Sequence, residues 1–302
     1  MNIENKFCLG ISKPFDILNS DIRKLIKFTI SNKLYVHASI TYPINFIFIR
    51  KLLKKKTRNN INFICKVLGD NIINFNKTVE LTLKEFSLKK IHILQLVCLP
   101  TYKKGGREIE NINLIELNKI KISIDSLKQK NIIDKVYLQI FSSDKLEFCE
   151  KLISYFDGFA FYGTTNQIEL DRNVYNFIVL RNVPLINLAV FGNPKPKEKI
   201  ETNLHLKSFA FSQSYFTSNT ISVGRTTKLT RLKDLHKYKD QKEKIKIVFN
   251  PKFIKSVECQ DNADNFYKRY KVTNKTYLII FLFKCLIKKV LPIKLIRILK
   301  KN

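Results

Sequence analysis

Acidic residues are scarce in this chain, and so are glycine and proline. Its 302 residues include 25 Asp and Glu against 55 Lys and Arg, which gives a formal net charge of +30. Eight Gly and eight Pro, without a collagen-like or Gly/Ser period, exclude fibrous and linker-like classes. Hydrophobic residues make up 45% of the sequence, which is enough to bury a large core and excludes a disordered tail. The length suits two ordinary domains or one large barrel with additions.

No CxxC pair occurs among the six cysteines, which lie in apolar stretches where a free thiol behaves as a small hydrophobic group. Neither the cysteines nor the four histidines cluster in the sequence, so a metal site is not expected. The N-terminal residues MNIENKFCLGIS lack the basic and apolar regions of a signal peptide. We therefore expect a protein of the reducing cytosol.

The excess of positive charge has two competing interpretations. It points to a polyanionic partner, either nucleic acid or an anionic membrane. Alternatively, Lys, Asn and Ile are abundant throughout, as a codon bias toward A and T would produce, and scattered Lys then forms only a solvated surface. Nucleic acid is the less favoured partner, because no recognised reader motif is found and the basic residues of the C-terminal region alternate with aliphatic side chains.

Short apolar runs rich in β-branched and aromatic residues alternate with stretches of helical period for most of the length. Eight such runs predict strands, at residues 6–12, 34–40, 61–67, 91–97, 135–142, 158–163, 184–190 and 220–224. Continuous apolar strands separated by helices indicate a parallel sheet covered on both sides, and eight units in about 240 residues predict a (β/α)8 TIM barrel. An open doubly wound sheet is the alternative, but no GxGxxG pattern follows the first strand.

Three intervening segments illustrate the predicted helices, at residues 20–31, 144–156 and 228–238. Ser20 is placed to cap the first and Asp144 to open the second. Leucines at positions 229, 232 and 235 give the third an apolar face.

A basic segment ends the chain. From Asn265 to Asn302 there are eleven Lys and Arg and no acidic residue, so this stretch supplies +11 of the +30. Its longest apolar run, Tyr277–Phe283, is far short of the roughly 20 residues of a spanning helix. Lys284, Lys288, Arg297 and Lys301 recur at helical spacing, which is typical of an interfacial helix on anionic lipid. The predicted division is therefore a barrel over 1–240, a connecting segment over 241–274 and a basic amphipathic helical extension over 275–302 that contacts an anionic membrane surface through residues 277–301.

Residues at the ends of the predicted strands carry a family resemblance. Tyr42 follows the second strand, Lys66 ends the third, LQLVCLP closes the fourth at Pro100, Ser142 ends the fifth, and SVGRTTKLTRLKD (222–234) ends the eighth. In their order and spacing these features resemble the aldo-keto reductases, over about residues 6–238. The resemblance implies a (β/α)8 barrel and an oxidoreductase that uses NADP(H).

The active site of that family is a tetrad of Asp, Tyr, Lys and His, in which Tyr gives a proton to a carbonyl that receives hydride. Tyr42 and Lys66 match, whereas His37 takes the place of the Asp and Cys98 that of the His. A phenol is a useful acid near neutrality only when a cation stabilises its anion, and Lys66 can supply that cation. A neutral His37 cannot form the ion pair of a carboxylate but can still accept a hydrogen bond, and Cys98 is a weak donor. We therefore expect slow carbonyl reduction or none.

The resemblance also implies a dinucleotide site at the end of the eighth strand, where a helix N-terminus can bind phosphate. The candidate cofactor-binding residues are Ser142, Ser143, Gly224, Arg225, Thr226, Thr227, Arg231 and Asp234. Ser143 departs from the Ser-Asn pair that holds the nicotinamide amide, and the Gln usual on the sixth strand is missing from GFAFYG.

Two functions follow from these patterns. The first is a divergent NADP(H)-dependent oxidoreductase that acts on a carbonyl or sugar-type small molecule, lies in the cytoplasm and attaches to the inner face of a membrane. The second is a non-catalytic descendant of the same barrel that serves as a binding or scaffold protein.

Overall fold

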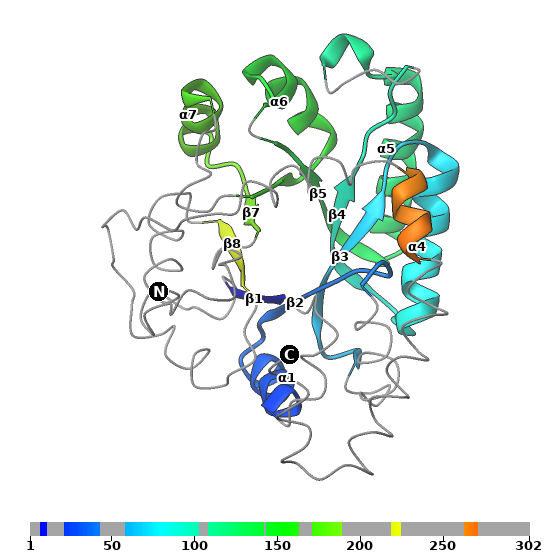
Figure 1. Cartoon of the computed structure of the whole chain (residues 1–302), viewed down its shortest axis with the longest axis vertical. Helices are drawn as coiled ribbons and strands as arrows, with labels where there is room; N and C mark the ends of the chain where they lie inside the picture. The colour runs from blue at the N-terminus through cyan, green and yellow to red at the C-terminus, as the bar shows by residue number, and fades with distance from the viewer. Residues whose placement is uncertain are drawn as a thin grey trace, which may run out of the picture.

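The computed structural model describes residues 7–10, 21–42, 58–102, 108–141, 143–162, 171–188, 219–224 and 263–270. Within them eight parallel strands pair in sequence order, and β1 also pairs with β8, so the sheet closes into a barrel. The strands are β1 (Phe7–Gly10), β2 (Tyr35–Ala38), β3 (Asn62–Leu68), β4 (Ile91–Val97), β5 (Ile133–Gln139), β6 (Gly158–Phe161), β7 (Leu185–Asn187) and β8 (Thr220–Gly224). The predicted (β/α)8 barrel is confirmed (Figure 1).

Helices lie outside this barrel, as Figure 1 shows for α4, α5, α6 and α7. The described helices are α1 (Asp21–Ser31), α4 (Ile72–Phe86), α5 (Leu114–Gln129), α6 (Leu146–Leu152) and α7 (Arg172–Leu180), with 3-10 turns η4 (Ile109–Asn111) and η5 (Ile153–Tyr155). Polar side chains begin three of them: Asn71 accepts from the Asn74 amide at 2.8 Å, Asn113 from Glu116 at 3.1 Å and Asp171 from Asn173 at 2.7 Å. Of the three helices predicted above, α1 and α6 are confirmed, and 228–238 lies outside the described residues.

Alternation along each strand divides the buried side chains into two clusters. Side chains on the outer face of the strands pack with the helices, for example Phe63 of β3 with Phe75 of α4, in one large apolar cluster. A smaller cluster fills the barrel interior and includes Ile64, Ile93 and Tyr137. Side chains two residues apart on a strand point to the same face. The residue that follows an interior position by two therefore also points into the barrel, nearer the carboxyl end of the strand.

The predicted cap of the second helix is wrong. The residue before α6 is Lys145, whose side chain makes no cap hydrogen bond. Asp144 is 3% exposed, and its Oδ2 accepts a hydrogen bond from the Phe141 amide at 2.8 Å. That amide lies just beyond the end of β5 and needs an acceptor in a buried position, so the carboxylate turns back to it and leaves the helix uncapped.

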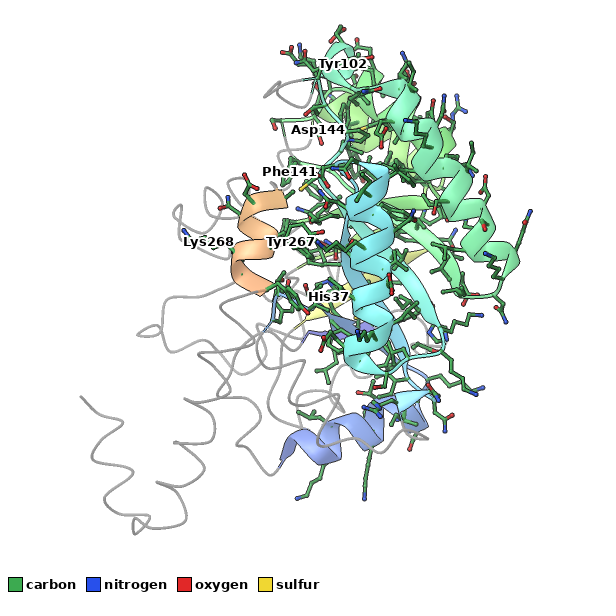
Figure 2. The ribbon with its side chains drawn as sticks, turned by 90° about the vertical axis from the view of Figure 1, so that its right-hand side faces the viewer. His37, Tyr102, Phe141, Asp144, Tyr267 and Lys268 are labelled. Carbon is green, nitrogen blue, oxygen red and sulfur yellow. The ribbon has the colours of Figure 1, made fainter. Side chains whose placement is uncertain are left out.

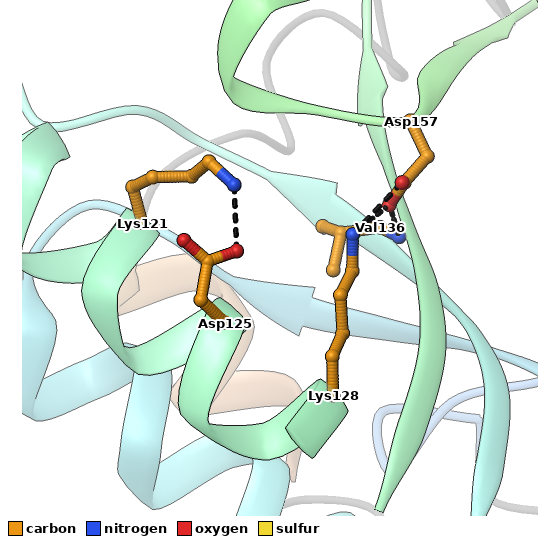
Figure 3. A network of polar contacts seen from close by, with 5 residues as sticks. All are labelled: Lys121, Asp125, Lys128, Val136 and Asp157. Atoms are coloured by element: carbon orange, nitrogen blue, oxygen red, sulfur yellow. Dashed lines mark hydrogen bonds and ion pairs between the residues drawn. The ribbon is translucent and has the colours of Figure 1, made fainter. Parts of the chain in front are cut away.

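An ion-pair network connects the end of α5 to the amino-terminal end of the strands (Figure 3). Lys128, near the end of α5, lies 2.7 Å from Oδ2 of Asp157, and the same oxygen accepts from the Val136 amide at 2.7 Å. Asp157 in turn donates its own amide to the Val136 carbonyl at 2.8 Å. Lys121 and Asp125 form a separate pair within α5 at 2.6 Å. At this end of a (β/α)8 barrel such contacts serve stability rather than chemistry.

Residues 263–270, inside the predicted connecting segment, form a helix that packs beside α4 in both views (Figures 1 and 2). Phe266 is 5% exposed and joins the large apolar cluster. The Tyr267 hydroxyl donates to Asn74 Oδ1 at 2.9 Å, and the Tyr270 hydroxyl donates to Glu85 at 3.3 Å. The Lys77 ammonium lies 5.0 Å from the centre of the Tyr267 ring. These contacts join the last described segment of the chain to the barrel wall.

Candidate functional site

Four polar side chains point into the barrel near the carboxyl ends of β2 to β5. Lys66, Gln95 and Gln139 each lie two residues after an interior member of the same strand, namely Ile64, Ile93 and Tyr137. His37 likewise lies two residues after Tyr35, which packs against the interior cluster. The carboxyl end of the strands is where (β/α)8 enzymes hold their reactive groups.

Three of these side chains form a hydrogen-bonded chain across the barrel. Nε2 of His37 lies 2.7 Å from Oε1 of Gln95, and Nε2 of Gln95 donates to Oε1 of Gln139 at 2.8 Å. All three side chains are buried, with exposed fractions of 7%, 0% and 1%. Since an amide oxygen only accepts, Nε2 of His37 carries the proton and Nδ1 carries a lone pair.

His37 is neutral at physiological pH. Burial, followed by the nearby positive charge of Lys66, lowers the pKa of His37 to about 4, although its hydrogen bond to Gln95 acts in the opposite direction. Lys66 therefore lies within electrostatic range of the imidazole. In the sheet, Lys66 is also paired in register with Gln95, and its side chain is partly buried.

Tyr42 lies in a turn that follows β2. Its amide donates to the Ser39 carbonyl at 3.0 Å, and the Ser39 hydroxyl bonds the Thr41 hydroxyl at 2.7 Å and accepts from the Thr41 amide at 3.2 Å. This local network holds the turn so that the rings of Tyr42 and His37 meet edge to face, with centroids 6.0 Å apart. The structure therefore brings together three of the four predicted catalytic residues, Tyr42, Lys66 and His37.

Cys98, the fourth, is placed differently. It directly follows β4 with a left-handed backbone, φ 62°, and its 7% exposed side chain belongs to the large apolar cluster between barrel and helices. His37 and its hydrogen-bonded partners belong to strands β2, β4 and β5 and point into the barrel interior. The left-handed backbone redirects the chain at the position that holds the carbonyl donor in the resembling family.

Two of the predicted cofactor-binding residues are described. Ser143 is exposed in the turn beyond β5, which ends at Gln139 rather than at the predicted position 142, and Gly224 ends β8. Both lie at the same end of the barrel as Tyr42. The other six lie outside the described residues: Ser142, Arg225, Thr226, Thr227, Arg231 and Asp234.

Gln95 and Gln139 are site residues that the sequence patterns did not identify. Each is a buried amide among apolar neighbours in the carboxyl-terminal half of its strand, IHILQLV and IDKVYLQ. The same signal drew attention to Lys66, because a polar group in a buried strand needs a partner. That requirement holds for an uncharged amide as well, and it marks both glutamines.

The burial of neutral His37 predicts a loss of stability in acid. The unfolded state binds a proton near the ordinary pKa of 6.5 and the folded state only near 4, so the free energy of unfolding should fall by about 3 kcal/mol as pH decreases across that window. We expect His37→Gln to remove this decrease, as measured by urea unfolding over a pH series. His92 and Asp70, whose pKa values are also shifted, titrate in both proteins and cancel in the difference. An equal acid loss in the variant would contradict the assignment.

No protein-family model and no curated protein sequence matches the chain. Solved structures with the same barrel do match. A putative aldo-keto reductase from Pseudomonas aeruginosa is 14% identical, covers 77% of this chain and 87% of its own length, and superposes with a TM-score of 0.54. An aldose reductase from Giardia lamblia is 8% identical, with coverage of 84% and 91% and a TM-score of 0.54.

An aldo-keto reductase of the silkworm Bombyx mori, solved in complex with NADPH, is 12% identical with coverage of 85% and 84% and a TM-score of 0.50. At these identities the likeness establishes a shared fold. The resemblance inferred from the strand ends is thus confirmed at the level of the fold.

Proposed function

We propose that the protein is a divergent NADP(H)-dependent oxidoreductase of the aldo-keto reductase type, acting on a carbonyl or sugar-type small molecule. The observation that carries this proposal is the meeting of Tyr42, His37 and Lys66 at the carboxyl end of the barrel. The ring contact of 6.0 Å and the effect of Lys66 on the pKa of His37 join residues from three separate positions in the chain. A shared fold alone would not require that arrangement.

Tyr42 would act as the general acid. Its phenolic proton would pass to the substrate oxygen, and the Lys66 ammonium would stabilise the phenolate that remains. The edge-to-face contact with His37 orients the Tyr42 ring. Because the pKa of His37 is lowered to about 4, the imidazole adds no positive charge and does not compete with Lys66 as the local cation.

The described residues at the rim fit a dinucleotide. Gly224 presents backbone without a side chain at the end of β8, and the exposed hydroxyl of Ser143 lies in the turn beyond β5. These two residues would hold NADP(H) together with Ser142, Arg225, Thr226, Thr227, Arg231 and Asp234. When bound, the reduced nicotinamide supplies the hydride.

Fluorescence titration with NADPH tests this proposal. We expect saturable binding with enhancement of the nicotinamide emission. Replacing Arg231 with Ala should weaken NADPH binding about tenfold and leave NADH nearly unchanged, because a charged hydrogen bond to the 2′-phosphate contributes about 1.5 kcal/mol or more. Absence of binding at high micromolar NADPH would contradict the oxidoreductase.

A non-catalytic binding protein built on the same barrel is the second candidate, and the placement of Cys98 favours it. Cys98 is buried among apolar side chains, and a thiol is a weak hydrogen-bond donor, so the position that supplies a carbonyl donor in the resembling family would polarise a carbonyl only weakly here. Loss of one such donor commonly costs about 3 kcal/mol of transition-state stabilisation. A protein that binds NADPH or a carbonyl compound without turnover would fit this second function.

We also propose that residues 275–302 attach the protein to the inner, anionic face of a membrane, which would place the protein at the cytoplasmic side. None of the helices within the described ranges is long and apolar enough to cross a bilayer. The predicted extension itself lies outside those ranges. The extension contains eight Lys and Arg and no acidic residue, which supports adsorption at an anionic surface.

Flotation with phosphatidylserine vesicles measures this attachment. The full chain should float with the vesicles, because each Lys or Arg near an anionic surface contributes about 1 kcal/mol, and high salt should release it. A full-length variant with Lys284, Lys288, Arg297 and Lys301 changed to Gln should remain at the bottom of the gradient, as should a chain ending at Asn274. Vesicles of phosphatidylcholine serve as the neutral control. Equal flotation of all three proteins would rule out the membrane role of the basic segment.

A further inference from the structure

In the buried hydrogen-bonded chain of His37, Gln95 and Gln139, each side chain donates to the next. Gln139 accepts from Gln95 through its Oε1, so the Gln95 amide must present its own oxygen to His37. Rotating the Gln95 amide would set its nitrogen against Nε2 of His37 and its oxygen against Oε1 of Gln139, two acceptors facing each other. While Gln139 presents its oxygen, the Gln95 amide therefore presents its own oxygen to the imidazole.

We propose that Gln95, oriented by Gln139, is a positioning residue that holds His37 in the Nε2–H tautomer, so that the Nδ1 lone pair is the acceptor for the Lys66 ammonium. This inference deepens the proposed function and rests on it for its catalytic meaning. The resembling family uses a carboxylate at this position. Here a neutral imidazole takes that role, and two amides define which of its nitrogens can accept.

Two observations and one chemical argument support this assignment. The His37–Gln95 and Gln95–Gln139 contacts, at 2.7 and 2.8 Å, are short and buried, which makes rotation of the Gln95 amide alone costly. Lys66 stands in register with Gln95 on the neighbouring strand, and its charge acts on His37. A proton on Nδ1 would face that ammonium, whereas a lone pair can accept from it.

The tautomer can be observed directly. Nitrogen NMR of the full-length protein labelled with 15N-histidine distinguishes protonated from unprotonated ring nitrogens, and the His37 signals are those lost in His37→Gln. At neutral pH we expect a protonated Nε2 and an unprotonated Nδ1. A protonated Nδ1 in the unaltered protein would overturn the proposal.

Two substitutions of Gln95 have opposite expected effects. Gln95→Leu removes the acceptor and should abolish the pure Nε2–H signature. Gln95→Glu retains an acceptor, so it should keep that signature, and its negative charge should raise the titration midpoint of His37 by at least about one pH unit. Gln139→Leu should give a mixture of tautomers, while the exposed Gln129→Leu should change nothing. An unchanged His37 spectrum in Gln95→Leu would overturn the role of Gln95.

Lys66→Met tests the second half of the proposal. Removing the positive charge should raise the titration midpoint of His37, and an unchanged midpoint would show that Nδ1 does not face the ammonium.

Turnover of 4-nitrobenzaldehyde with NADPH supplies the catalytic readout: Gln95→Glu should displace the pH profile of kcat with little change in KM. A protein that fails to bind NADPH yet keeps the Nε2–H signature would refute the oxidoreductase and leave the tautomer assignment standing. If Gln95→Glu alters the histidine NMR signals but leaves the pH profile of kcat unchanged, the two glutamines have no role in catalysis.

Discussion

Replacing Tyr42 with Phe should lower turnover of a carbonyl compound by a factor of about 100 to 10,000, because positioned general acids contribute in that range. The ring and its 6.0 Å contact with His37 are retained, and only the phenolic proton is lost. NADPH binding and the thermal midpoint should therefore stay close to those of the unaltered protein. The measurement is NADPH consumption with 4-nitrobenzaldehyde, with fluorescence titration of NADPH alongside it.

Tyr102→Phe provides the matched control for this experiment. Tyr102 lies beyond the end of β4, at the same end of the barrel, and is 52% exposed, so removal of its hydroxyl should leave turnover unchanged. Turnover retained in Tyr42→Phe would show that another group supplies the proton.

Gly158→Ala should destabilise the fold by about 3 kcal/mol or more. A Cβ at Gly158, the first residue of β6, would clash with the carbonyl oxygen of Pro184 and lie 3.0 Å from its carbonyl carbon. That oxygen also accepts the Phe159 amide at 2.9 Å, so neither strand can move away without breaking a bond of the sheet. Overpacking against backbone is costly because no side-chain rotamer can relieve it. Urea unfolding followed by circular dichroism would measure the loss.

Gly10→Ala is the comparison for this variant. A Cβ at Gly10, the last residue of β1, would meet Val223 Cγ1 at 3.4 Å and the Gly224 carbonyl oxygen at 3.5 Å, which are ordinary contacts. Its stability should stay within about 1 kcal/mol of the unaltered protein. An identical unfolding midpoint for Gly158→Ala would mean that β6 and β7 do not approach each other as described.

The strands were predictable because their signal is local. A strand buried on both faces must be apolar at nearly every position, and segments such as IHILQLV and GFAF carry that requirement in their own residues. The predicted range 91–97 and the described β4 coincide, and so do 220–224 and β8. The predicted cap at Asp144 was wrong for the opposite reason: its carboxylate accepts from the buried Phe141 amide, a partner that the helical pattern does not reveal.

The candidate site was predictable only in part. Tyr42, Lys66 and His37 were found because a family resemblance supplied their order, and the structure places them together. Gln95 lies 58 residues from His37 and Gln139 another 44 residues on, and no local pattern links them. Cys98 occupies the expected position in the sequence, but its left-handed backbone and its burial among apolar side chains are set by the turn that follows β4.

The sequence by itself determined the eight-stranded barrel and the division of positive charge, because periodicity and composition are properties of neighbouring residues. The tertiary structure alone decided that His37 is neutral, that it joins two glutamines in a hydrogen-bonded chain and that Cys98 is buried among apolar side chains with a left-handed backbone. Those outcomes depend on the stagger of the strands as the sheet closes, which brings side chains from different strands to the same level inside the barrel. Burial and a neighbouring charge then set the chemistry of each group, and both are consequences of that closure.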